Sequence, residues 1–98
     1  MYTILVIRTA VLTESAKRDL RKVPGHVARK LLVWVDAVEQ DGLEEVRKVP
    51  GYHDEPLKGT RRGQRSIRLS LAYRAIYVVK RDGGIEIASV EEVNRHDY

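Results

Sequence analysis

Residues 65–79 read RSIRLSLAYRAIYVV and carry more information about the fold than any other part of the chain. The first half alternates strictly, with Ile67, Leu69 and Leu71 on one side and polar residues between them, which is the period of a half-buried strand. The second half, YRAIYVV, follows almost at once and is rich in aromatic and β-branched residues. These residues therefore predict a tight antiparallel hairpin.

A hairpin folded symmetrically about Leu71 places Arg68 opposite Arg74, on the face turned away from the core. Like charges directly opposite each other destabilise a sheet by a few tenths of a kcal/mol up to about 1 kcal/mol. A phosphate bound between them would reverse that cost, because guanidinium groups suit bidentate phosphate contacts. The alternative is that both arginines extend into solvent or pair with Glu91 or Glu92. A register shifted by one residue would instead place Arg68 in the core.

The hairpin belongs to a cationic interval of the chain. Between Glu55 and Asp82 there is no acidic residue, whereas the same interval contains many cations: Lys58, Arg61, Arg62, Arg65, Arg68, Arg74, Lys80 and Arg81. A segment of this charge is expected to attract a polyanion.

Length and composition predict one small globular domain over residues 1–98, with 43% hydrophobic and 33% charged residues and a net charge of +4. The chain has no cysteine, which excludes disulfides, thiolate metal sites and a cysteine nucleophile, and which fits a reducing cytoplasm. The apolar start of the chain lacks a basic leader and a cleavage site. It is also far shorter than the roughly 20 residues of a membrane span.

The segments before the hairpin predict one strand and two helices. Residues 2–8 are nearly continuous in apolar side chains and are expected to form a strand that is internal or covered on both faces. Thr13 is expected to cap a short helix that ends at Pro24-Gly25. From residue 26 to about 41, apolar residues recur at helical spacing and complete a helical hairpin, and Trp34 is expected to be a core residue that packs the helix against the sheet.

Glycines are expected to end the second helix at Gly42 and to turn the chain at residues 82–84. A last strand follows, in which Ile85 and Ile87 alternate with Glu86. The order of elements is then β-α-α-β-β-β, an α+β fold with a two-helix hairpin packed on one face of an antiparallel sheet. The opposite face is left for another role.

These motifs, in this order, resemble the RelE/ParE superfamily of bacterial toxins from type II toxin–antitoxin modules, in particular the mRNA-interferase branch that includes RelE, YoeB and HigB. The resemblance covers the whole order of elements. It is sharpest in EPLKG at 55–59, GQRSIRL at 63–69, YRAIYVV at 73–79 and a chain end that carries a histidine and a tyrosine.

The resemblance implies a small basic toxin of the cytoplasm that enters the ribosomal A site and cuts the mRNA there. The chemistry of this branch uses no metal or other cofactor, and its nucleophile is the 2′-OH of the RNA itself. The partners it implies are a cognate antitoxin, the ribosome with its 16S rRNA, and mRNA. Operator DNA would be bound only by the toxin–antitoxin complex, and no membrane is involved.

The resemblance also implies roles for single residues. Glu55 matches the general-base glutamate of the EPLK motif, and Arg74 matches the phosphate-binding arginine, with Arg68 beside it. His96 is the candidate that returns a proton to the leaving 5′-oxygen, and Tyr98 the candidate for base stacking or a hydrogen bond to the phosphate. Cations so placed would relieve the negative charge that in-line attack builds on the phosphorane oxygens.

The tail departs from the family, because relatives end in His-Tyr or Asp-Tyr-His and this chain ends in His96-Asp97-Tyr98. Asp97 therefore stays an alternative acid or base, as does His53, which lies two residues before Glu55. The scattered histidines show no metal-ligand spacing. Further cations of the same loop are expected to hold ribosomal RNA and the message backbone without sequence preference: Lys58, Arg61, Arg62 and Arg65.

Two other functions stay open at this point. A ParE-like toxin shares the fold but binds and poisons DNA gyrase and cuts nothing. A degenerate member would bind only its antitoxin and operator DNA, and would cause no growth arrest when expressed alone. Substituting Glu55 or His96 distinguishes the mRNA interferase from the gyrase inhibitor, because an interferase should lose toxicity while the toxicity of a gyrase inhibitor should barely change.

Overall fold

The computed structural model describes residues 6–95 of the chain. The elements follow in the order β1 (Ala10–Leu12), α1 (Glu14–Leu20), α2 (Gly25–Asp41), α3 (Leu43–Arg47), the 3-10 turn η1 (Pro50–Tyr52), β2 (Glu55–Pro56), the 3-10 turn η2 (Gly59–Arg61), β3 (Arg65–Arg68), β4 (Tyr73–Asp82) and β5 (Ile85–Arg95). None of the helices within residues 6–95 is long and apolar enough to cross a membrane.

The strands form one five-stranded sheet in the order β1-β5-β4-β3-β2. All neighbours are antiparallel except β1 and β5, which run parallel. The predicted α+β class is confirmed, but the prediction of a purely antiparallel sheet is wrong. Alternation along a strand reports which residues face the core and not which way a distant strand runs. Only tertiary packing decides that β1 joins the sheet beside the last strand.

The first strand differs from its predicted position at residues 2–8. Among the described residues it comprises Ala10–Leu12, lies at the edge of the sheet and leaves Val11 38% exposed, so it is neither internal nor covered on both faces. The reason is that the carbonyl oxygen of Ile7 accepts a hydrogen bond of 2.8 Å from the amide of Leu43, at the start of α3, and not from a strand. Residues 1–5 lie outside the described residues.

Helix α1 begins as predicted at Thr13, whose side-chain oxygen accepts a hydrogen bond of 3.1 Å from the amide of Ala16. The helix is joined to the sheet by Asp19, whose carboxylate accepts a hydrogen bond of 2.9 Å from the amide of Val93 in β5. This contact fixes α1 beside the end of β5.

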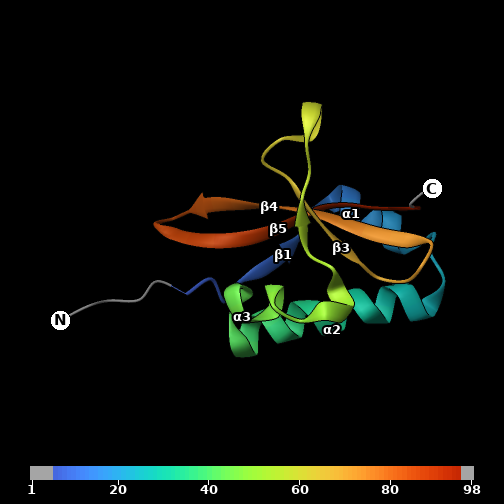
Figure 1. Cartoon of the computed structure of the whole chain (residues 1–98), viewed down its shortest axis with the longest axis horizontal. Coiled ribbons are helices and arrows are strands. Elements are labelled where there is room, and N and C mark those ends of the chain that lie inside the picture. The colour runs from blue at the N-terminus through green and yellow to red at the C-terminus, as the bar shows by residue number, and fades with distance from the viewer. Residues whose placement is uncertain (1–5, 96–98) are drawn as a thin grey trace.

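Helix α2 runs along one side of the sheet (Figure 1) and supplies the apolar stripe of the core. Val27, Leu31, Trp34 and Val38 are fully buried at helical spacing. The Trp34 ring lies 5.1 Å from the Tyr77 ring of β4, measured between centroids. The prediction that Trp34 packs the helix against the sheet is confirmed.

The β3–β4 hairpin has the register predicted from symmetry, with Arg68 paired with Arg74. Leu71, however, is 78% exposed, so its predicted place on the core side is wrong. The strands stop at Arg68 and resume at Tyr73, and the Ser70 hydroxyl accepts hydrogen bonds of 3.2 Å from the amides of residues 72 and 73. Strand alternation therefore does not extend through this turn.

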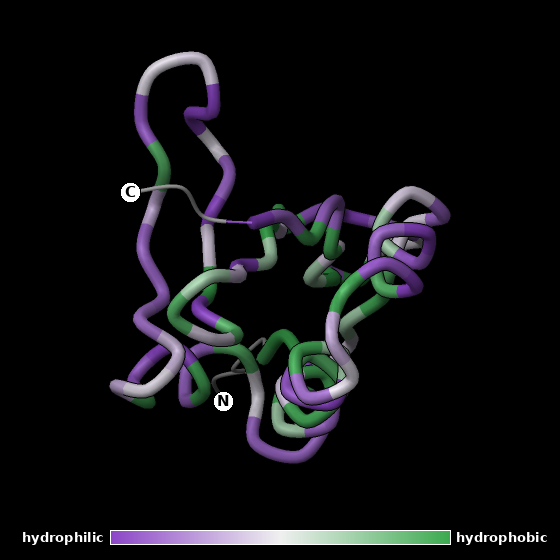
Figure 2. The backbone as a smooth tube through the Cα atoms, turned by 90° about the vertical axis from the view of Figure 1, so that its right-hand side faces the viewer, coloured by the Kyte–Doolittle hydropathy of each residue, from purple (hydrophilic) through white to green (hydrophobic). Residues whose placement is uncertain are grey.

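One face of the sheet is covered by α2 and the other is more open. Ile67, Ala75 and Tyr77 face the helix and belong to the core. The segment between β2 and β3, which contains η2, projects from the sheet on the side opposite to α2 (Figure 1). Figure 2 shows that this projecting segment is mostly hydrophilic. The core therefore lies under α2, and a hydrophilic segment projects from the other side of the sheet.

We expect Gly42→Ala to lower the free energy of unfolding by about 1–3 kcal/mol. Gly42 ends α2 with φ 88° and ψ 148°, which a side chain rarely tolerates, and an added Cβ would lie 2.4 Å from Cγ1 of Val6. Urea unfolding measures the change. The control is Gly51→Ala, because its added Cβ meets no atom within 4 Å and its φ is not positive. Equal stability of the two variants would contradict this assignment.

Candidate functional site

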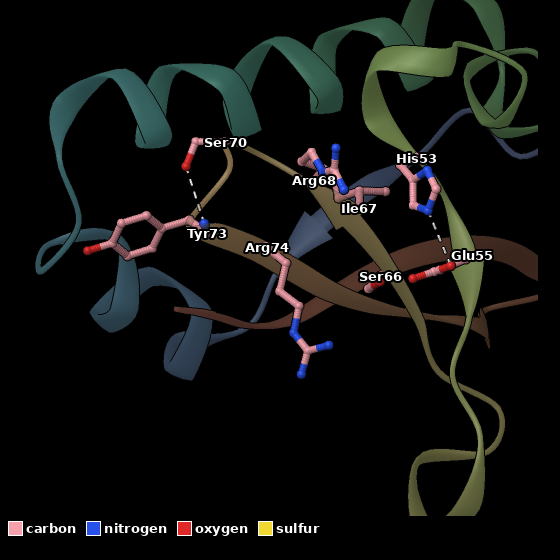
Figure 3. Close-up of a pocket in the computed structure, with 8 residues that line it drawn as sticks. All are labelled: His53, Glu55, Ser66, Ile67, Arg68, Ser70, Tyr73 and Arg74. Atoms are coloured by element: carbon pink, nitrogen blue, oxygen red, sulfur yellow. Dashed lines mark hydrogen bonds and ion pairs between the residues drawn. The ribbon is translucent and has the colours of Figure 1, made fainter. Parts of the chain in front are cut away.

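A hollow opens where β2, β3 and the start of β4 meet (Figure 3). The residues that line it come from the segment before β2, from β3, and from the turn into β4: His53, Glu55, Ser66, Ile67, Arg68, Ser70, Tyr73 and Arg74. Figure 3 shows His53 and Glu55 at one end of the hollow and Tyr73 at the other. The hollow thus joins residues of the predicted cationic interval with His53 and Glu55, which lie just before it.

Strand register places three of the predicted site residues on one face. Glu55 pairs with Ser66 across β2 and β3, and Arg68 lies two residues further along β3. Arg68 in turn pairs with Arg74 on β4. Because cross-strand partners and residues two apart share a face, Glu55, Arg68 and Arg74 all project from the face opposite α2.

His53 lies beside Glu55, with Nε2 of the imidazole 3.4 Å from Oε2 of the carboxylate. The two side chains are 58% and 54% exposed, so both are accessible to a ligand in the hollow. His53 has φ 45°, a left-handed conformation that costs a non-glycine residue about 1–3 kcal/mol. That conformation turns the chain from η1 into β2 and brings the imidazole next to Glu55.

Arg74 is held by a chain of polar contacts. Its Nε donates a hydrogen bond of 3.1 Å to Asn94, and Asn94 donates one of 2.6 Å to Glu92. The same Glu92 oxygen pairs with Arg61 of η2 at 3.1 Å. Neither Glu91 nor Glu92 pairs with Arg74 or Arg68, and within residues 6–95 Arg68 has no hydrogen-bonded partner. Arg74 is therefore fixed while Arg68 is free to meet an anion.

The cations expected to hold RNA lie in different surroundings. Arg61 is paired with Glu92, and Arg65 pairs with Asp54 on the helix side of the sheet. Lys58 and Arg62 are exposed and make no ion pair with any described residue. Of this set, Lys58 and Arg62 are the ones whose charges are not already neutralised within residues 6–95.

Asp54 is the buried centre of a polar cluster on the helix side. Its side chain is 1% exposed, with one oxygen 2.6 Å from Arg65 Nε and the other accepting a hydrogen bond of 2.5 Å from the Tyr77 hydroxyl. Arg47 Nε also donates to that hydroxyl at 3.3 Å. Burial, followed by the hydrogen bond to Asp54, raises the pKa of Tyr77 to about 12.

The Asp54 carboxylate also acts on Arg65. Burial by itself would lower the pKa of the Arg65 guanidinium, but the hydrogen bond and the charge of Asp54 outweigh burial, and the pKa is raised. Sequence reasoning missed Asp54, as it missed Asn94. The only signal for Asp54 was its position next to Glu55, because adjacent residues entering a strand face opposite sides of the sheet.

The tail candidates His96, Asp97 and Tyr98 lie outside the described residues. The last described residue, Arg95, pairs with Tyr73 at one end of the hollow. Within residues 6–95 there is no group of three or more metal-ligating side chains that could hold an ion.

Comparisons with known proteins give a structural match only. The sequence matches no protein family and no curated protein at a significant level. The structure is similar to a YoeB/ParE toxin from Agrobacterium tumefaciens, with a TM-score of 0.65 and 21% identity over 91% of this chain and 99% of the toxin. It is similar to YafQ from E. coli, with a TM-score of 0.69 and 15% identity over 91% of this chain and 93% of YafQ.

A third structure is the toxin–antitoxin complex RelBE2 from Mycobacterium tuberculosis, with a TM-score of 0.65, 21% identity and coverage of 93% of this chain and 100% of the matched chain. The chain has the RelE-like fold. At 15–21% identity these three structures establish its architecture and leave the chemistry of the hollow open.

We expect Arg68→Gln to raise the free energy of unfolding by a few tenths up to about 1 kcal/mol in chloride buffer, since it removes a like charge opposite Arg74. In phosphate buffer of equal ionic strength, the difference in free energy of unfolding between the variant and the wild-type protein should shrink or change sign, because phosphate binding stabilises the wild-type protein. Urea unfolding in both buffers measures the two effects.

The control for Arg68→Gln is Arg18→Gln, which removes an exposed charge from α1. If the two variants respond to phosphate alike, Arg68 and Arg74 do not form an anion site.

We expect stability to fall between pH 10 and about 12 through the titration of Tyr77. Its pKa in the folded protein is above the ordinary value of 10, so the folded state holds this proton more tightly than the unfolded chain. The contribution is complete below pH 10 and is lost as the pH rises through about 12, on the order of 2–3 kcal/mol in total. In Tyr77→Phe the free energy of unfolding, measured with urea, should therefore fall less over this pH range than in the wild-type protein. An equal fall in both proteins would contradict this.

Proposed function

We propose that this chain is the toxin of a type II toxin–antitoxin module and that it is an endoribonuclease that cuts mRNA in the ribosomal A site. The observation that carries the proposal is the placement of the Glu55 carboxylate in one hollow, and on one face, with Arg68 and Arg74. The RelE-like fold supports it, as does the absence of acidic residues between Glu55 and Asp82.

The hollow has the groups that cleavage by a 2′-OH requires. Glu55 accepts the proton of the 2′-OH, and the 2′-oxygen attacks the adjacent phosphorus. Arg68 and Arg74 stabilise the negative charge that develops on the non-bridging oxygens. The bond to the 5′-oxygen then breaks, and that oxygen takes a proton from a general acid. The products are a 2′,3′-cyclic phosphate and a 5′-hydroxyl, and neither an oxidant nor a second substrate is consumed.

A histidine is the residue best suited to the acid step at neutral pH. His53 is in place beside Glu55, at 3.4 Å, and so forms an imidazole–carboxylate pair within a single segment. His96, with Asp97 and Tyr98, stays the alternative from the tail. Comparing His53→Gln with His96→Gln for loss of cleavage assigns the acid.

The proposed partners follow from charge. Lys58 and Arg62 on the projecting segment, with Arg68 in the hollow, form the surface that we expect to contact ribosomal RNA and the message backbone. One structure with this fold is a toxin–antitoxin complex. For this chain we propose a cognate acidic antitoxin that covers the arginines, operator DNA bound only by that complex, and action in the cytoplasm as a single domain over residues 1–98.

We expect Glu55→Gln to slow cleavage by about 10²- to 10⁴-fold, the usual contribution of a general base. The measurement is primer extension on a defined mRNA in a purified translation system, with ribosomes and without them. Wild-type protein should produce new stops of primer extension at A-site codons only when ribosomes are present. The control is Glu39→Gln, because Glu39 is exposed on α2, away from the hollow.

Intact message in the presence of the wild-type protein would reject the nuclease and make a gyrase cleavage assay the next experiment. Positive results there, unchanged by Glu55→Gln, would identify a ParE-like inhibitor. Cleavage that survives Glu55→Gln at full rate would instead keep the nuclease and remove Glu55 from the mechanism.

A further inference from the structure

The side chains of residues 53–55, which lead from η1 into β2, lie on two sides of the backbone. His53 and Glu55 line the hollow on the open side. Asp54, between them, is almost fully buried on the side of the sheet that faces α2. The same short segment therefore presents two accessible side chains to the hollow and inserts the third into the protein.

Asp54 contacts the two strands that carry the site arginines. Its two carboxylate oxygens bind Arg65 of β3, at 2.6 Å, and Tyr77 of β4, at 2.5 Å. Arg65 and Tyr77 are themselves cross-strand partners. Arg65 lies three residues before Arg68, and Tyr77 lies three residues after Arg74. One buried carboxylate thus links the segment of Glu55 to both arginine-bearing strands.

Among the described residues, this segment has few other contacts besides the short pairing of β2 with β3. Strand β2 has two residues, of which Pro56 has no amide hydrogen to donate, and it lies at the edge of the sheet. The flanking backbone contacts are a 3.1 Å hydrogen bond from His53 to Pro50 and a 2.9 Å hydrogen bond from Leu57 to Gln64. The left-handed backbone of His53 also needs surrounding contacts to persist.

We propose that Asp54, Arg65 and Tyr77 form a positioning clamp that holds Glu55 and His53 in register with Arg68 and Arg74. The catalytic role of this clamp rests on the proposed function. Its members do not touch the RNA. Their loss should reduce kcat through misplacement of Glu55, because small displacements of a catalytic group can cost about a hundredfold in rate. KM should stay nearly constant, because Arg68 remains free to bind the phosphate.

The test is Tyr77→Phe, which removes the hydroxyl bound to Asp54 and keeps the ring that packs on Trp34. Its control is Tyr52→Phe, since Tyr52 is also buried, precedes the same segment, and makes no hydrogen bond through its hydroxyl to any described residue. We expect Tyr77→Phe to lower kcat for ribosome-bound mRNA by ten- to a hundredfold with KM changed by less than about twofold. Tyr52→Phe should retain the wild-type kcat.

A double variant distinguishes positioning from general destabilisation. If the hydroxyl acts through Glu55, Tyr77→Phe should have no further effect on kcat in the Glu55→Gln background. Equal losses in both backgrounds, or a loss that appears in KM alone, would overturn the clamp. Arg65→Lys keeps the charge but loses the fixed geometry of the guanidinium. It serves as the second variant if Tyr77→Phe folds poorly, and the same loss of kcat is expected.

Amide hydrogen exchange tests the clamp without reference to activity. The amides of His53 and Leu57 should exchange at least tenfold faster in Tyr77→Phe than in the wild-type protein. Their exchange rates should be unchanged in Tyr52→Phe. Unchanged exchange in Tyr77→Phe would overturn the clamp whatever the enzyme kinetics show. Faster exchange in a protein that cuts no RNA would support the clamp as a structural device and overturn the proposed function alone.

Discussion

The register of the β3–β4 hairpin is the constraint on which the rest of the structure depends. Pairing Arg68 with Arg74 on one face requires Ile67 and Ala75, one residue away on each strand, to face α2. The repulsion of the paired arginines is tolerated because the same register buries the apolar face. The packing of the core and the arrangement of the proposed anion site are therefore two consequences of a single pairing, and a shift by one residue would destroy both.

Tyr77 connects the stability of the core to the geometry of the hollow. Its ring packs on Trp34 of α2, and its hydroxyl donates to Asp54, which precedes Glu55 in the chain. The buried carboxylate of Asp54 thereby holds the backbone that carries the exposed carboxylate of Glu55. This arrangement leaves Glu55 and His53 open to a ligand without leaving their backbone unsupported.

The sequence predicted what depends on local periodicity. Helix α2, its end at Gly42, the Thr13 cap and the opposition of Arg68 and Arg74 all follow from patterns of a few residues. It did not predict the contacts that form between distant segments. Tertiary packing sets the pairing of Arg61 with Glu92, the pairing of Arg65 with Asp54, and the parallel edge strand. The alternation of residues along a single strand does not report such packing. The exposure of Leu71 has a different cause, because a tight turn ends strand alternation.

The most direct measurement of the central claim is the chemical identity of the RNA ends formed when the wild-type protein acts on ribosome-bound mRNA. Attack by the 2′-OH, with Glu55 as base and the arginines on the phosphate, predicts 5′-hydroxyl ends that accept phosphate from a polynucleotide kinase, and 2′,3′-cyclic phosphate ends upstream of each cut. Fragments with 5′-phosphate ends would show that water and not the RNA attacks the phosphorus. That result would contradict the roles proposed for Glu55, Arg68 and Arg74 in attack by the 2′-OH.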